Sequence, residues 1–167
     1  AKSYLVDGNS HKKPLTKEIE QRSIHRHIVP LLGKKRLSQI TKQDLQKFMT
    51  DVAAGKTATD IKTGHRGRAI VKGGQGTANR ALAVVSALFN YAIDSGLCSD
   101  NPTRGVKQYR LKQHDRYLNT EELIRLGEAL TKAEESYFSP FAIAAIRFML
   151  LTGCRSGEAL TLQWRWL

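Results

Sequence analysis

Arg155 and Glu158 are the two residues of this sequence whose types and spacing fit the most specific chemistry. An apolar segment ends at Gly153, and Arg155 then opens a new short helix. An arginine at a helix start directs its planar guanidinium outward, where it matches the oxygens of a phosphate. Glu158 follows one turn later and can hold that guanidinium in place. The spacing predicts a phosphate-binding arginine with a supporting carboxylate, and an ordinary surface ion pair is the alternative.

Basic residues between positions 56 and 76 form a second group of candidates. This stretch combines lysine, arginine and histidine with five glycines, which predicts a basic loop or hairpin with a short strand over 69–71. Cations on such an element follow the phosphates of DNA and supply affinity without sequence information. The candidate phosphate contacts are Lys62, Arg66, Arg68 and Lys72.

A helix is expected to begin near Thr77, directly after this stretch. Its first turn could direct Thr77 to a phosphate, while Asn79 and Arg80 carry groups able to read adenine and guanine edges. The alternative is that Thr77 only caps the helix and that Arg80 is solvated. His25 and His27, on an earlier helix, are expected to be solvated or to face DNA.

Charge is distributed unevenly along the 167 residues, which carry 27 Lys and Arg against 15 Asp and Glu. Residues 1–113 hold 21 of the cations and 8 acids, a net charge of +13, whereas residues 114–167 hold 6 and 7, a net charge of −1. Such an excess indicates a polyanionic partner, but it does not separate DNA from RNA or an acidic surface. The step in charge predicts a domain boundary.

Composition excludes several other classes. With 41% hydrophobic residues and only Cys98 and Cys154, the chain is neither a disordered tail nor a disulfide scaffold. No apolar run reaches the ~18 residues that span a membrane, so we expect a cytoplasmic protein without membrane contact. No pattern of metal ligands is evident, and neither a metal nor another cofactor is expected.

Apolar periodicity predicts a mainly α fold. In the basic part we expect helices over 16–29, closed by Pro30, over about 42–54, and from Thr77 to about 95. The second is the clearest, since Thr41 and Asp44 suit a capping box before an apolar stripe of Leu45, Phe48, Met49 and Val52. After residue 116, Asn119 and Glu122 suit another capping box, and the apolar segment 141–151 is expected to be a central buried helix.

The string from Leu151 through Arg155 to Leu160, with Leu162 and Trp164, resembles the first arginine motif of the tyrosine recombinase (phage integrase) family, of the prophage type. The resemblance implies an N-terminal extension over 1–13 and a helical, SAM-like core-binding domain over 14–108. A linker over 109–116 and the truncated N-terminal part of an α-rich (α+β) catalytic domain over 117–167 would follow.

Members of this family cut and rejoin DNA through a 3′-phosphotyrosyl intermediate, without a metal. The resemblance implies that Arg155 is the first of two arginines that stabilise the charge developing on the phosphate, with Glu158 supporting it. It also implies double-stranded DNA as the partner and association with the nucleoid. Complete proteins of the family assemble as tetramers on DNA, and this chain is expected to be a monomer when free.

The sequence departs from the family pattern after Arg155. The family's lysine, His-x-x-Arg motif and nucleophilic tyrosine follow the first arginine, but the residues after Arg155 include no Tyr, His or Lys. His65 to Arg68 matches His-x-x-Arg only by composition, because it lies upstream. We therefore expect a fragment of a recombinase that is inactive alone. The alternatives are a complete, non-enzymatic helical nucleic-acid-binding protein and a protein-interaction module.

Overall fold

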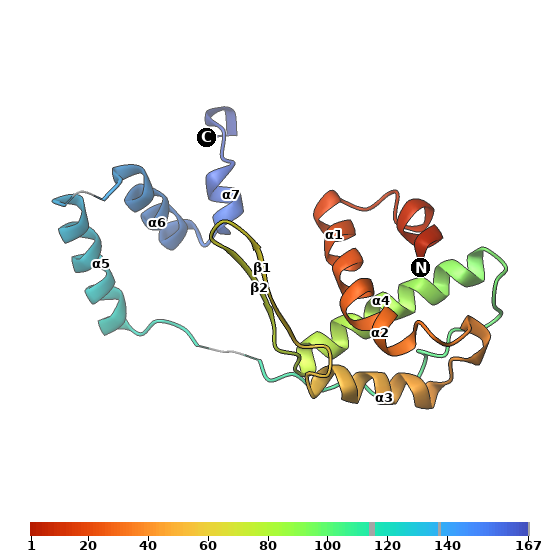
Figure 1. Ribbon diagram of the computed structural model, residues 1–167. Coiled ribbons are helices and arrows are strands. Elements are labelled where there is room, and N and C mark those ends of the chain that lie inside the picture. The colour runs from red at the N-terminus through yellow and green to blue at the C-terminus, as the bar shows by residue number, and fades with distance from the viewer. Residues whose placement is uncertain (114–115, 137, 167) are drawn as a thin grey trace. The chain divides into compact units, whose positions relative to one another are not determined.

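The computed structural model of the chain describes residues 1–113, 116–136 and 138–166, and it forms two compact units, Ala1–Lys112 and Gln113–Leu167 (Figure 1). The first unit contains helices α1 (Pro14–Ser23), α2 (Val29–Leu32), α3 (Lys42–Ala53) and α4 (Gln75–Asp94), with strands β1 (Thr59–Gly64) and β2 (Gly67–Val71). The second contains α5 (Thr120–Glu134), α6 (Pro140–Thr152) and α7 (Ser156–Leu160). The mainly α fold predicted from the sequence is confirmed.

Helices α3 and α4 form the centre of the first unit. The predicted stripe of α3 is buried in full, and Phe48 is 2% exposed. From α4, the residues Ala78, Ala81, Leu82, Val85 and Phe89 complete the core. The Thr41 hydroxyl accepts a hydrogen bond from the Asp44 amide, and the Asp44 carboxylate accepts one from the Thr41 amide, so the predicted capping box is present.

Acidification is expected to weaken the start of α3 through Asp44. Hydrogen bonds from Lys35 Nζ (2.6 Å) and the Thr41 amide (3.0 Å) lower the pKa of the Asp44 carboxyl to about 2, from 3.8. The unfolded chain takes up this proton near the higher value and the folded chain near the lower one. The stabilisation from Asp44 is therefore fully present above about pH 4 and is lost as the pH falls to about 2.

Urea unfolding of the wild-type chain and of Asp44→Asn at several pH values measures this effect. The variant should be the less stable protein at about pH 6, and the two curves should converge toward about pH 2. A difference in stability that stays constant across this range would contradict the assignment.

The first helical segment differs from its prediction. Pro30 does not end the helix: α1 passes into a π-helical turn over Ile24–Ile28, and α2 continues to Leu32. The wider π turn directly before Pro30 accommodates a residue that lacks an amide proton and whose ring would clash within a regular helix. Ile24 and Ile28 of this segment are buried in the core, whereas Ile19 is 53% exposed.

Residues 1–13, the expected N-terminal extension, pack into the first unit. Tyr4 is buried and lies edge-on to the Tyr91 ring of α4, with 5.6 Å between the centroids. Its hydroxyl donates to Glu20 Oε2 (2.9 Å), and Lys12 Nζ donates to both residues. Burial raises the pKa of Tyr4, so this hydroxyl stays a donor. These hydrogen bonds satisfy the polar groups of Tyr4 and Glu20 where they are buried.

The end of the first unit is held to α4 by a buried asparagine. Asn101 Nδ2 donates to Asn90 Oδ1 (2.7 Å) and to Ser86, and its Oδ1 accepts from the Thr103 amide (3.0 Å). The chain after α4 therefore runs back along that helix.

In the second unit, the predicted capping box between Asn119 and Glu122 opens α5 and is confirmed. The expectation of a buried central helix over 141–151 is wrong. Only Ile143 of α6 is buried, and Phe141 is 85% exposed. An all-round apolar helix needs partners on every side, and among the described residues of this unit only α5 and α7 make more than a few contacts with α6.

Candidate nucleic-acid interface

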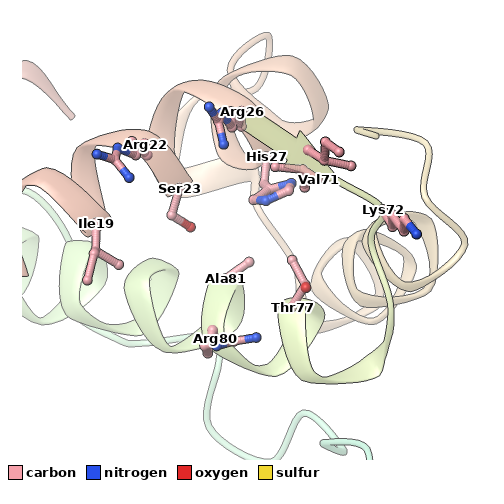
Figure 2. A pocket seen from close by; sticks show the side chains of 11 residues that line it. Ile19, Arg22, Ser23, Arg26, His27, Val71, Lys72, Thr77, Arg80 and Ala81 are labelled. Atoms are coloured by element: carbon pink, nitrogen blue, oxygen red, sulfur yellow. The ribbon is translucent and has the colours of Figure 1, made fainter. Parts of the chain in front are cut away.

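Three segments of the first unit surround one cleft of about 330 Å³. The α1 helix and the π turn after it form one wall, the end of β2 forms the second, and the first turns of α4 form the third (Figure 2). Four cations line this cleft: Arg22, Arg26, Lys72 and Arg80. The sequence predicted Lys72, Thr77 and Arg80 as binding residues, and the structure places these three around one cleft.

Most of this charge is not neutralised within the described chain. Arg22 pairs with Glu18, whereas Arg26, Lys72 and Arg80 form no ion pair with any residue that the structure describes. Arg80 Nε donates only to the Gly76 carbonyl oxygen (3.3 Å). Three cations from three segments thus face one space, which favours an anion there.

His27 forms part of the same cleft. It is buried, which excludes a solvated side chain and leaves the predicted alternative of facing DNA, and its Nδ1 lies 2.6 Å from Thr57 Oγ1. Burial, and then the charge of Arg26, lower the pKa of His27 below its usual 6.5. The imidazole is therefore neutral at pH 7 and contributes a hydrogen bond, not a charge, to the cleft.

The predicted basic loop is a β-hairpin that projects from the helices of the first unit (Figure 1). Lys62 and Arg68 are direct partners across its two antiparallel strands, and Arg66 lies in the turn with a φ of 60°. Arg68, a predicted phosphate contact, donates from Nε and Nη2 to the two Asp60 carboxylate oxygens. The hairpin returns to α3 through Gly73, where a Cβ would meet the Val52 carbonyl oxygen at 2.6 Å.

At the start of α4, Thr77 and Arg80 line the cleft, whereas Asn79 faces another segment. Gly74 is the N-cap, so the helix begins before Thr77, whose hydroxyl donates to the Gly73 carbonyl oxygen (2.9 Å). Asn79 Nδ2 donates to the Tyr109 carbonyl oxygen and Asn79 Oδ1 accepts from the Tyr109 amide. Both ends of this amide are occupied, so Asn79 fixes the chain near residue 109 instead of facing a base. Thr77 and Arg80 both line the cleft, and Arg80 is the exposed cation of the three.

Arg22 and Arg26 are the residues that sequence reasoning missed. They are four positions apart, which places them on one helix face, and this spacing was the available signal. Arg22 and Arg26 come close to Lys72 and Arg80 only because α1 packs against the rest of the unit. A local sequence pattern cannot predict this proximity.

In the second unit, Arg155 directly precedes α7 and is 88% exposed. Its backbone amide donates to Glu158 Oε2 (2.8 Å), and its Nη1 lies 3.4 Å from Glu158 Oε1. The pair predicted from the spacing is therefore formed. Gly153 ends α6 in the left-handed region, with a φ of 67°, and gives the turn that places Arg155 at the start of α7. The guanidinium keeps its remaining donors for a ligand.

No helix in the described part of the chain is long and apolar enough to cross a membrane. No solved structure matches the chain. The chain is 26% identical over 149 residues to IntQ of Escherichia coli (strain K12), a protein described as defective; the match covers 86% of this chain and 34% of IntQ. The chain thus spans about a third of this curated relative.

The model of the phage integrase central domain matches residues 1–109. This range includes the cleft, the hairpin and nearly all of the first unit. The chain therefore belongs to the phage integrase family, as the residues around Arg155 predicted.

Proposed function

We propose that this chain is the DNA-binding part of a site-specific DNA recombinase, and that its first unit binds double-stranded DNA through the cleft and the hairpin. The observation that carries the proposal is the group of Arg26, Lys72 and Arg80 around one cleft without an ion-pair partner in the described chain. Net charge supports it, because residues 1–113 carry 13 more cations than acids. The first unit corresponds to a core-binding domain, residues near 109–116 to a linker, and the rest to the start of a catalytic domain.

Arg155 and Glu158 supply the chemical part of the proposal. In the complete recombinase, a tyrosine hydroxyl attacks a DNA phosphorus, a 5′-hydroxyl leaves, and a 3′-phosphotyrosyl bond forms. A 5′-hydroxyl from another strand later reverses the step. Arg155 donates to the phosphate oxygens on which negative charge accumulates, and Glu158 holds the guanidinium in position. Losing such a donor lowers the rate on the order of 10²- to 10³-fold.

None of the tyrosines in this sequence matches the position of the family's nucleophile. The five tyrosines all precede Arg155, whereas the family's nucleophile follows it. We therefore expect the chain alone to bind DNA without cutting it. As a free chain it is a monomer in the cytoplasm, and it joins the nucleoid and a tetrameric assembly only as part of the complete recombinase on DNA.

Binding of the purified chain to a fluorescent duplex, measured over a series of salt concentrations, tests this function. With about six phosphates engaged, the affinity should fall roughly 10³-fold between about 50 and 200 mM salt, because each contact releases counterions. The same samples on a denaturing gel should contain no covalent protein–DNA adduct, even with a nicked duplex.

A salt-independent affinity would contradict the electrostatic interface. Tighter binding to an acidic protein than to DNA would favour a protein-interaction module instead. A covalent adduct would contradict the inactivity of the chain, and would leave DNA binding standing.

A further inference from the structure

The hairpin carries an arginine whose guanidinium is fixed by a neighbouring carboxylate. Arg68 Nε donates to Asp60 Oδ1 (2.7 Å) and Arg68 Nη2 to Asp60 Oδ2 (2.5 Å), which gives two parallel hydrogen bonds. The strand register pairs Asp60 with Ile70 and Arg68 with Lys62, so Asp60 and Arg68 are diagonal neighbours on one face. Both side chains are exposed. The pair fixes the plane of the guanidinium and leaves Nη1 and the second proton of Nη2 free to donate outward as a two-donor edge.

The same face concentrates positive charge. Lys62 lies directly across from Arg68, and like charges at such positions destabilise a strand pair. With Arg66 they border one shallow hollow, together with Asp60 and Gly67. Three cations and one carboxylate leave this face a net charge of +2. Hairpin stability alone does not explain this arrangement, whereas a polyanionic ligand does.

The hairpin turn adds a second, independent observation. Arg66 has a φ of 60°, in the left-handed region that asparagine and glycine enter most easily. The turn itself gains nothing from arginine at this position. A backbone conformation that disfavours the residue present points to a function of its side chain, here a cation at the tip of a projecting element.

The two-stranded form of the hairpin favours the major groove of DNA over that of RNA. A two-stranded ribbon fits the major groove of B-form DNA, which is about 12 Å wide. The major groove of an RNA helix is too deep and narrow for side chains to read. In the DNA groove, guanine presents O6 and N7 as adjacent acceptors that match the donor edge of an arginine.

We infer that the β1–β2 hairpin enters the major groove of DNA and that Arg68, positioned by Asp60, reads a guanine. The inference rests on the proposed function and adds base recognition to it. Lys62 and Arg66 contact the phosphates on either side of the groove. Lys72, which follows β2 directly and lines the cleft, binds the backbone at the base of the hairpin.

Selection of duplexes from a randomised pool by the purified chain provides the test, with Arg68→Ala, Arg68→Lys and Asp60→Asn selected in parallel. The wild-type chain should enrich a site with a fixed guanine. Replacing that base pair should weaken binding about 5- to 150-fold, as expected for a bidentate contact. All three variants should lose most of this preference. Arg104→Ala and Asp100→Asn, which alter an exposed arginine–aspartate pair outside the hairpin, serve as matched controls and should keep it.

Asp60→Asn separates positioning from simple repulsion. An aspartate that only repels phosphates would, once neutralised, leave the preference for guanine intact while affinity rises for every sequence. A positioning aspartate would lose the preference, whatever happens to the overall affinity. Circular dichroism of each variant should match the wild type, because the hairpin is exposed.

Two outcomes would overturn the inference while leaving the proposed function in place. One is salt-dependent DNA binding without any enriched guanine. The other is an enriched guanine that survives in Arg68→Ala. Failure to bind any duplex would instead overturn the proposed function, and stronger binding to an RNA pool of the same design would contradict both.

Discussion

Replacing Arg26, Lys72 and Arg80 together with glutamine is expected to weaken binding of duplex DNA roughly 10²- to 10³-fold at about 0.1 M salt. Each cation that contacts a phosphate releases close to one counterion, so each loss removes almost a factor of ten at this salt concentration. The three side chains face one cleft and form no ion pair with the described residues, so their removal leaves no acid unpaired there. The fold should therefore be unaffected.

A salt titration of the same variant distinguishes lost phosphate contacts from a general change in charge. The slope of log affinity against log salt should decrease by about three. The matched control replaces Lys2, Lys34 and Lys47, three cations of the first unit that line neither the cleft nor the hairpin hollow. Equal losses in the two variants would show that net charge, and not the cleft, drives binding.

Phe48→Ala is expected to destabilise the first unit by about 3–5 kcal/mol. Phe48 is 2% exposed and lies in the core formed by α3 and α4, next in the stripe to Leu45, Met49 and Val52. Removing its ring loses buried apolar surface and leaves a cavity that the surrounding helices close only in part. Amide hydrogen exchange of α3 and α4 measures this directly, because both tryptophans lie in the other unit and do not report on this core.

The control for this prediction is Phe141→Ala. Phe141 lies in the second unit and is 85% exposed. The same substitution there should change the free energy of unfolding by no more than about 0.5 kcal/mol. A small effect of Phe48→Ala, or similar effects of both substitutions, would contradict the assignment of the core. The pair of variants differs in burial and not in the atoms removed.

The features that the sequence predicted correctly depend on residues three or four positions apart. The capping boxes at Thr41 and Asn119 and the buried stripe of α3 are examples. The contact between Arg155 and Glu158 is of the same kind. Helical geometry brings such residues together whatever the rest of the chain does, so their pattern is readable before any packing is known.

Other features depend on contacts between distant segments. Asn79 was expected to face a base, but its amide bonds the backbone of Tyr109, thirty positions later. Tyr4, in the expected N-terminal extension, packs on Tyr91 and bonds Glu20. The partner of Asn79 is a backbone group, which carries no residue-specific signal, and the partners of Tyr4 lie too far along the chain for a local pattern to indicate them.

The sequence by itself determined the class of the protein: a mainly helical chain with a basic first part and an arginine motif that resembles the family's first arginine motif, hence a member of the phage integrase family. Only the tertiary structure decided which cations share one cleft. Packing places Arg26 of the π turn beside Lys72 and Arg80, and the strand register places Asp60 beside Arg68. The physical reason is that a binding surface is defined by distances in space, which helix packing and strand register set and which composition and local periodicity do not contain.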